Sequence, residues 1–307
     1  MSNQIFELLI LGSSAATPTL NRHPTSQLLN IADRYFLIDC GEGTQMQLRK
    51  HKVRFQSINQ IFISHLHGDH FYGLPGLLAS MHLLGRTNDL TIYGPKELQP
   101  IIELIHQHSD TYLNYDLKFV QTQHNFKELI FEDEKVEVYS LPLKHRIPTT
   151  GYLFKEKPLS RNIDKFKLSK MNVSFAEIHK LKQGLDAIDN HGNIIQNELL
   201  TLDPPKQRSY AFCSDTKFFE KLALDIKNVD LLYHESTFLE DKKDRAKQTF
   251  HSTAKDAAQI AVLSNANKLL LGHFSARYVN LDDFLTEARS VFQNCELAIE
   301  GNKFFIS

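Results

Sequence analysis

Three histidines and an aspartate lie within six residues of the chain, in the segment His65-Leu66-His67-Gly68-Asp69-His70. Neutral imidazole and ionised carboxylate suit a borderline cation such as zinc, and catalytic zinc sites are usually built from these groups. A single histidine near a strand end is usually a solvated or structural side chain. Four such groups at His-x-His-x-Asp-His spacing instead predict a metal site.

The local structure expected here separates the ligands into two sets. The apolar run before the motif predicts a strand over 60–64, so His65 and His67 would project to the same side, because side chains repeat every two residues. Gly68 then lets the backbone turn, and Asp69 and His70 begin a helix. Asp69 and His70 cannot easily reach a metal held by the first two histidines. The spacing therefore indicates two metal positions, as used for displacement at phosphoryl or acyl centres.

Further potential ligands follow apolar, strand-like runs elsewhere in the chain: His145, Asp215 and His273. Strand ends along one edge of a sheet allow a rigid scaffold to bring distant residues to one site. Each of the three alone has an ordinary structural explanation. Coincidence is a poor explanation for their shared placement after strand-like runs. We therefore expect these three residues to lie beside the His-rich segment in the folded chain.

The remaining pattern predicts strands first and helices after them in each half of the chain, which favours two sheets with helices outside. Strands are expected over 4–13, 27–31, 35–39, 60–64, 90–93, 116–121, 128–132, 135–143, 209–216, 229–233 and 268–271. Helices are expected over 45–50, 71–84, 96–106, 254–263 and 281–292.

The composition is that of an ordinary globular protein, with 42% hydrophobic and 23% charged residues among 307. The 35 lysines and arginines balance 36 acidic residues, so net charge points to no polyanionic partner, although a local basic patch stays open. Three scattered cysteines form no disulfide framework and indicate a reducing compartment. The start Met1-Ser2-Asn3-Gln4 lacks signal-peptide features, and no apolar run reaches the roughly 18 residues of a membrane span. We expect a cytoplasmic protein outside the membrane.

Residues 155–208 differ in character from the rest of the chain. Their apolar residues are thinly spread, and basic residues recur: Lys155, Lys157, Arg161, Lys165, Lys167, Lys170, Lys180 and Lys182. A basic insertion into a β-rich core is either a solvated excursion or a phosphate-binding arm. The sequence leaves both readings open.

The His-rich motif resembles that of the metallo-β-lactamase superfamily. That resemblance implies an αββα sandwich, an α/β protein of the α+β type with two mixed sheets, helices outside and a metal site at the edge between the sheets. We expect one such domain over residues 1–307, with a basic arm inserted at about 155–208.

Motifs over nearly the whole chain outside the insertion resemble the ribonuclease Z family more closely. They are residues 12–15, 39–45, the His-rich segment, 214–216, 234–237, 251–253 and 272–278. The last three separate this family from lactamases and glyoxalase-like thioesterases. The resemblance implies a zinc endonuclease that removes the 3′ trailer from precursor tRNA, leaving a 3′-hydroxyl on the tRNA and a 5′-phosphate on the trailer. Asp39 in the second motif could equally be a turn or N-cap residue.

The resemblance also implies two zinc ions per subunit, although manganese or iron would suit the same groups. One ion would be held by His65, His67 and His145, and the other by Asp69, His70 and His273. Asp215 would bridge the two.

Catalytic roles follow from the same resemblance. Asp69 would position the attacking water and accept its proton. His251 is the candidate general acid, and Glu235 would orient it or raise its pKa. An N-cap role for residues 251–253 and a structural salt bridge for Glu235 remain open. The histidines outside these motifs receive no role, except that His234 could support a metal ligand.

Family members bind tRNA through a flexible arm and often work as homodimers, so precursor tRNA and a second copy of the chain are the expected partners. This sequence departs from the family pattern at two places. The insertion reads Met171-Asn172-Val173-Ser174 where many relatives carry a Gly-Pro pair. The loop 18–23 has Leu20 and His23 where relatives commonly have Lys and Asn, and that loop is associated with tolerance of a CCA end. The cleavage position is therefore left open.

Two other functions compete with tRNA processing. A phosphodiesterase for small or cyclic esters could use the same dinuclear site, but a basic insertion would then lack a purpose. A non-catalytic RNA-binding or scaffold protein would have little reason to keep a complete set of metal ligands.

Overall fold

The computed structural model describes residues 4–171 and 173–307, which form two compact units. The core unit comprises residues 4–132, 136–155 and 208–307, and the inserted unit comprises 133–135 and 156–207. Asn172, in the segment that departs from the Gly-Pro pattern, and Met1 to Asn3, used above to judge the N-terminus, lie outside the described residues.

The core unit is built on two seven-stranded mixed sheets. The first sheet has the order β20 (Lys303–Phe305), β1 (Phe6–Gly12), β3 (Ser26–Ile31), β4 (Arg34–Ile38), β5 (Ile58–Phe62), β6 (Leu90–Gly94) and β7 (Leu117–Gln121). The second has the order β19 (Cys295–Leu297), β17 (Lys268–Gly272), β16 (Leu231–Glu235), β15 (Ser209–Cys213), β10 (Thr150–Glu156), β9 (Val136–Pro142) and β8 (Glu128–Glu132). Strands β4 to β7 are parallel to one another, as are β15 to β17.

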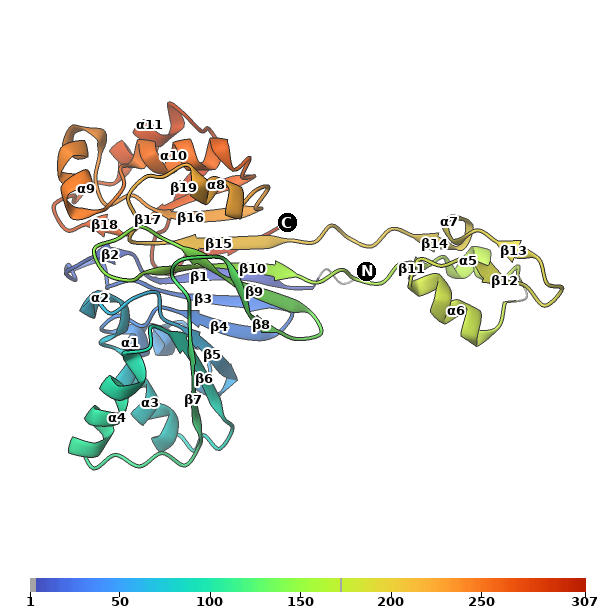
Figure 1. Ribbon diagram of the computed structural model, residues 1–307, viewed down its shortest axis with the longest axis horizontal. Helices are drawn as coiled ribbons and strands as arrows, with labels where there is room; N and C mark the ends of the chain where they lie inside the picture. The colour runs from blue at the N-terminus through green and yellow to red at the C-terminus, as the bar shows by residue number, and fades with distance from the viewer. Residues whose placement is uncertain (1–3, 172) are drawn as a thin grey trace. The chain divides into compact units, whose positions relative to one another are not determined.

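Helices cover the outer face of each sheet (Figure 1). On the first sheet these are α1 (Thr44–Lys50), α3 (Leu74–Leu83) and α4 (Leu98–His108). A 3₁₀ turn at Phe55–Ser57 follows α1, and the short α2 (Gly68–Phe71) precedes α3. On the second they are α8 (Lys221–Asp225), α10 (Ala254–Leu263) and α11 (Asp282–Arg289), with α9 (Lys243–Thr249) after a 3₁₀ turn at Glu240–Lys242. Short strands β2 (Ser14–Ala15) and β18 (Phe274–Ser275) pair in parallel. The expected αββα fold is confirmed.

The alternation of side chains along the strands produces this layering. In β1, Leu8 and Ile10 face the core between the sheets, where Tyr152 and Phe212 meet them from the second sheet. Leu9 and Leu11 point the other way and pack in the core under the helices of the first sheet. Both faces of the strand are thus buried, which explains why it reads as a continuous apolar run.

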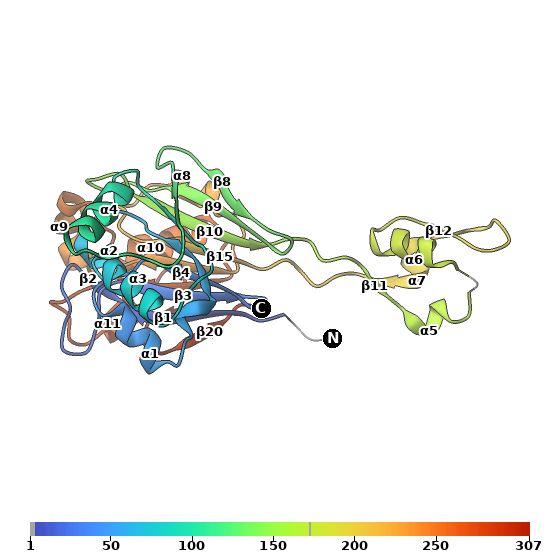
Figure 2. The same ribbon diagram turned by 90° about the horizontal axis from the view of Figure 1, so that it is seen from below.

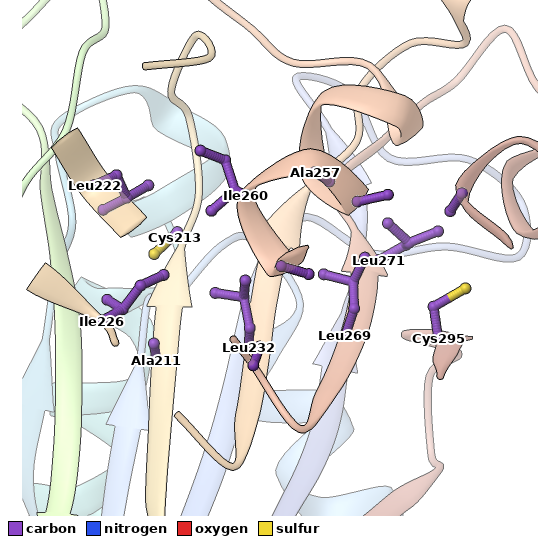
Figure 3. Close-up of a cluster of buried hydrophobic side chains, with 14 of the residues drawn as sticks. Ala211, Cys213, Leu222, Ile226, Leu232, Ala257, Ile260, Leu269, Leu271 and Cys295 are labelled. Carbon is purple, nitrogen blue, oxygen red and sulfur yellow. The ribbon is translucent and has the colours of Figure 1, made fainter. Parts of the chain in front are cut away.

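A third core lies between the second sheet and its helices. Leu232 and Leu271 of the sheet pack against Ala257 and Ile260 of α10 (Figure 3). The hydroxyl of Thr253 accepts a hydrogen bond from the Asp256 amide, and the Asp256 carboxylate accepts one from the Thr253 amide. This capping box begins α10 two residues after His251.

Several expected element bounds differ from the structure. The strand expected at 60–64 ends at Phe62. The amide of Ile63 still donates to the carbonyl of Tyr93 in β6 at 2.8 Å, whereas the amide of Ser64 donates to the side chain of Asp39 at 2.7 Å. His65 and His67 therefore come from a loop, and the two-residue strand repeat does not place them. The helix expected at 71–84 is divided into α2 and α3, with Pro75 in the first turn of α3.

The inserted unit has secondary structure of its own, which the sequence analysis did not resolve. Its elements are β11 (Asn162–Ile163), α5 (Lys165–Leu168), α6 (Phe175–Lys182), β12 (Ala187–Ile188), β13 (Ile194–Ile195), α7 (Asn197–Leu200) and β14 (Thr201–Leu202), as Figure 2 also shows. A small core gathers around Leu181 and Leu200. The buried amide of Asn197 donates to the carbonyls of Leu181 and Leu185 at 2.7 and 2.8 Å.

None of the helices in the described parts of the chain has the length and apolar character that a membrane span requires.

Candidate metal centre

Loops at the ends of β5, β9, β15 and β17 bring all the candidate ligands of the sequence analysis together. Their ligand atoms form overlapping groups in which every atom lies within 4.8 Å of the others. The groups are His65, His67, His145 and Asp215, then Asp69, His70 and His273, and finally Asp215, His251 and His273. Residues far apart in the sequence thus share one centre.

Asp215 lies between the two sets of histidines. Its Oδ2 is 2.9 Å from Nε2 of His70 and 3.1 Å from Nε2 of His273. Its Oδ1 faces the other way, 3.6 Å from Nε2 of His145 and 4.0 Å from Nε2 of His65. One carboxylate therefore presents one oxygen to each set, which is the arrangement of a bridging ligand in a dinuclear metal site.

Backbone conformation turns the last ligands toward the centre. Asp215 and His273 come just after the ends of β15 and β17, and both have positive φ angles, 56° and 57°. Non-glycine residues rarely adopt this left-handed conformation, and such strain concentrates at functional sites. It directs each side chain away from the path of its strand.

Hydrogen bonds define which ring nitrogen of His273 faces the centre. The hydroxyl of Thr237 lies 2.5 Å from Oε2 of Glu235, and an ionised carboxylate can only accept, so the hydroxyl donates to it. Nδ1 of His273, 2.9 Å from the same hydroxyl, must then be the donor of the second bond. The lone pair of His273 is left on Nε2, toward Asp215.

The same logic holds for other histidines of the centre. His70 donates from Nδ1 to Oδ2 of Asp39 at 2.6 Å. His65 Nδ1 lies 3.0 Å from the Ser64 hydroxyl, which itself donates to Asp39. Nδ1 of His145 donates to the carbonyl of Phe250 at 3.0 Å. Each ring keeps its lone pair on Nε2 for the centre.

These donors fit metal ions. Nε2 of His70 and Nε2 of His273 are buried and have no hydrogen-bond partner among the described residues. Nδ1 of His67 lies 3.0 Å from Nε2 of His65 and 3.3 Å from Nε2 of His145. Buried lone pairs that converge in this way are costly unless a cation binds them.

The charges around the centre lead to the same conclusion. Burial lowers the pKa of His65, His67 and His145, which favours the neutral form that binds metals. Burial would also lower the pKa of His70, but the carboxylates of Asp215, Asp69 and Asp39 raise it well above its usual value. The centre therefore attracts positive charge.

Asp39 supports the centre in a way that the sequence analysis missed. The residue is fully buried, and its carboxylate accepts hydrogen bonds from the amide and hydroxyl of Ser64 and from His70. It does not cap α1, whose N-cap is Gly43 without a side-chain bond. Gly41 in the same motif is needed because a Cβ there would overlap the carbonyl oxygen of Asp69. The turn after β4 thus packs directly against the loop that carries the His-rich segment.

His251 and Glu235 form a hydrogen-bonded pair beside the centre. Nδ1 of His251 lies 2.9 Å from Oε1 of Glu235 and 3.7 Å from Oδ1 of Asp215. Burial would lower the pKa of His251, but Glu235 and then Asp215 raise it to about 9. Glu235 is fully buried, yet it also accepts from the amides of Thr216 and Ser252. These bonds satisfy its charge inside the protein.

A cavity of about 630 Å³ opens over the centre, and its lining includes Asp69, His251 and His273. Three cations also line it: Arg146, Arg245 and Arg277. The sequence analysis did not single out Arg146 or Arg245, because neither belongs to a recognised motif. The cavity has the size and charge for a phosphate ester.

The loop that departs from the family pattern forms part of the cavity wall through Ala16, Pro18 and Pro24. Leu20 is fully exposed. His23 lies 2.8 Å from Oε2 of Glu300 through Nδ1, and it does not line the cavity. The substitutions at 20 and 23 therefore act on the anchoring and outer surface of the loop. His234 bonds through Nδ1 to the carbonyl of Glu235, and its supporting role stays a prediction.

Comparison with known proteins shows what the chain resembles. A family model described as Anti-Pycsar protein Apyc1 matches residues 6–164, a segment that ends before Asp215 and His273. Ribonuclease Z of Cytophaga hutchinsonii is 48% identical over 98% of this chain and 96% of that protein. The crystal structure of the short form of human tRNase Z is 27% identical, with a TM-score of 0.69 over 98% of this chain and 99% of that one. The metallo-β-lactamase fold protein YhfI of Bacillus subtilis shares the fold at 18% identity, with the same TM-score and coverage.

Proposed function

The chain belongs to the ribonuclease Z family, and we propose that its dinuclear centre holds two zinc ions that serve the removal of 3′ trailers from precursor tRNA. The enzyme is a tRNA 3′-processing endoribonuclease, a phosphodiester hydrolase that leaves a 3′-hydroxyl on the tRNA and a 5′-phosphate on the trailer. The observation that carries the zinc proposal is the position of Asp215, with one oxygen toward each set of histidines.

In this proposal, one zinc ion is held by His65, His67 and His145 and the other by Asp69, His70 and His273, with Asp215 between them. When bound, the two ions would lower the pKa of water and neutralise charge on the phosphodiester. Imidazole and carboxylate ligands without thiolate are those of catalytic zinc sites, which supports zinc over harder cations.

Asp69 positions the attacking water and accepts its proton. Its Oδ2 accepts a hydrogen bond from the amide of Ala16 at 2.7 Å, so the carboxylate is held in one orientation at the cavity wall. Burial opposes ionisation, but His70 and His273 hold the pKa of this carboxyl well below its usual range. Asp69 is therefore ionised at neutral pH, the form in which its oxygens accept hydrogen bonds from a water and can orient it.

His251 donates a proton to the leaving 3′ oxygen of the tRNA. Its hydrogen bonds within the described chain use Nδ1, which leaves Nε2 for the cavity that the ring lines. The raised pKa keeps the ring protonated at neutral pH, as a general acid must be. Glu235 orients the ring through Nδ1 and is a positioning residue.

Arginine side chains at the cavity wall bind the phosphates that flank the cleaved bond. Arg146, Arg245 and Arg277 approach the cavity from three different loops or helices. Guanidinium groups bind phosphate through two parallel hydrogen bonds and so fix its orientation. This arrangement would hold an RNA backbone across the metal centre.

We treat the insertion expected at 155–208 as an arm of a single metallo-β-lactamase domain, and its inserted unit as a tRNA-binding surface. Lys167 and Lys180 are engaged in ion pairs with Asp164 and Glu177. Lys165, Lys170 and Lys182 are exposed. Contacts from such lysines to phosphates recognise the shared shape of tRNA without reading its bases.

A homodimer in the cytoplasm is the expected form of the enzyme. Exposed apolar side chains at the end of α3 support a second copy as partner: Leu83 and Leu84. The free state of the three cysteines agrees with a reducing compartment.

The competing phosphodiesterase function for small esters is not favoured, since relatives over the full chain are ribonucleases Z. The decisive experiment is cleavage of a precursor tRNA with a 3′ trailer, with mapping of the product ends. Asp215→Ala should abolish cleavage, whereas Asp241→Ala, an exposed aspartate outside the cavity, should not. A wild-type enzyme loaded with zinc that leaves the precursor intact but hydrolyses a simple phosphodiester would overturn the proposal. The mapped end would also show whether the loop with Leu20 and His23 accompanies a shifted cleavage position.

A further inference from the structure

A basic run that the proposed catalysis does not use spans the last turn of α1 and the residues after it. It reads Arg49-Lys50-His51-Lys52-Val53-Arg54, and its lysine and arginine side chains are exposed. None of these four cations forms an ion pair with another residue of the described chain. Arg49 and Lys50 lie in the last turn of α1, where positive charge stabilises a helix. Lys52 and Arg54 lie beyond the helix, so stabilisation of the helix end does not account for their charges.

Lys52 and Arg54 stand at the edge of a hollow of about 420 Å³ on the first sheet. Its floor includes Asn30 of β3 and the half-buried ring of Tyr35 in β4. Lys303 of β20 also lines it and pairs with Glu7 at 2.9 Å. Cations at the rim with an aromatic ring and an amide inside form a combination that suits a nucleotide, and the volume is sufficient for one.

Positive charges act on His51, which lines the hollow. Burial lowers the pKa of His51, and the charges of Lys50 and Lys303 lower it further, while Glu300 opposes them. Glu7, which also lines the hollow, is paired with Lys303, and Glu300 bonds to His23. Neither neutralises Lys52 or Arg54.

Helix α1 connects this hollow to the catalytic cavity. Glu42, just before α1, lines the cavity, and the basic run starts in the last turn of the helix. A helix of seven residues is about 10 Å long. An RNA strand that leaves the metal centre along α1 would therefore reach Lys52 and Arg54 within a few nucleotides.

We infer that the hollow at Lys52, Arg54 and Tyr35 is a second RNA-binding site, which takes the single-stranded 3′ trailer beyond the cleaved bond. Lys52 and Arg54 bind trailer phosphates, and the ring of Tyr35 stacks with a base. The inference rests on the proposed function, because that function supplies a single-stranded segment leaving the cavity. It assigns the enzyme a preference for precursors whose trailers are long enough to pass α1.

The test uses the full-length enzyme and two precursor tRNAs that share one tRNA body, one with a short and one with a long trailer. In Lys52→Ala/Arg54→Ala, KM for the long-trailer precursor should rise about tenfold with kcat unchanged, since phosphate contacts contribute binding affinity. KM for the short-trailer precursor should stay the same. Lys52→Arg/Arg54→Lys keeps both charges and should behave as wild type. Lys221→Ala/Lys227→Ala removes two exposed charges on the other side of the core unit and should also have no effect.

Binding of a labelled single-stranded oligoribonucleotide separates this inference from the proposed function. The wild type should bind it with a steeper salt dependence than Lys52→Ala/Arg54→Ala, by about 1.4 in the log–log slope for two lost contacts. Oligonucleotide binding that depends on these residues, without tRNA cleavage, would overturn the proposed function but support the second site. Equal KM changes for both trailer lengths, or a change of oligomeric state in the double alanine variant, would overturn the second site.

Discussion

The hydroxyl of Thr237 lies 2.9 Å from Nδ1 of His273 and accepts a hydrogen bond from it, because the hydroxyl donates its own hydrogen to Glu235. This one contact links a metal ligand to the buried carboxylate that also orients the candidate general acid. We therefore expect metal affinity and proton transfer to be coupled through Thr237.

Replacement of Thr237 should separate binding of metal from packing. Thr237→Val keeps the shape but removes the acceptor for His273, so metal affinity or activity should fall about 10- to 100-fold. Thr237→Ser keeps the hydroxyl and should retain most of both. The measurement is the metal content per subunit after dialysis against a weak chelator, together with the cleavage rate. Full metal occupancy in the valine variant would show that the contact does not orient the ligand.

The pH profile should report the pair of Glu235 and His251. The pKa of His251 is raised to about 9, so the acid form predominates at neutral pH and is lost as pH rises through about 9. The kcat of the wild type should therefore fall as the pH rises through about 9. In Glu235→Gln the fall should begin at lower pH, toward the ordinary histidine pKa of about 6.5.

Single-turnover cleavage across this pH range provides the measurement, with His251→Ala as the control that lacks the titrating ring. The same sign applies to stability: the pair's contribution is complete below about pH 6.5 and disappears through about pH 9. If kcat fell at the same high pH in Glu235→Gln as in the wild type, the Glu235 carboxylate would not be the group that raises the pKa of His251.

Removal of metal should destabilise the core unit as well as stop cleavage. Asp215 and His70 are buried with ligand atoms that converge on the same space, and an ion bound only to the folded state adds stability. Each ion present at a thousandfold excess over its Kd would contribute about 4 kcal/mol. Thermal unfolding with and without a chelator measures this difference, and zinc should restore both Tm and activity. In Asp215→Ala the addition of zinc should shift Tm much less.

The inserted unit should contribute substrate binding and not chemistry. Lys165→Ala/Lys170→Ala should raise KM for precursor tRNA about tenfold and flatten its salt dependence, with kcat unchanged. Lys167→Ala/Lys180→Ala removes the same number of charges, but these lysines are already paired with Asp164 and Glu177, so its effect should be smaller. If both variants raised KM equally, ion pairing of a lysine within this unit would not determine whether that lysine contacts tRNA.

The sequence alone determined the fold class and the family, because both leave local patterns. Apolar strands with ligand-type residues at their ends, the spacing of His65 to His70 and the motifs at 234–237, 251–253 and 272–278 can be read without coordinates. Most of the longer elements in the core unit follow from the same periodicity, but the strand β10 and the helices α8 and α9 were not expected. The helices and strands of the insertion could not be predicted in this way, because its core is small and its elements are only two to eight residues long.

Tertiary structure decided how the ligands are oriented. The opposed oxygens of Asp215, the tautomer of His273 and the bonds of Asp39 to Ser64 and His70 join residues that lie far apart in the chain. A hydrogen bond between distant residues leaves no periodic trace in a sequence, because it depends on where folded strands and loops meet. The same holds for the hollow beside α1, which forms where the basic run meets residues of β1, β3, β4 and β20.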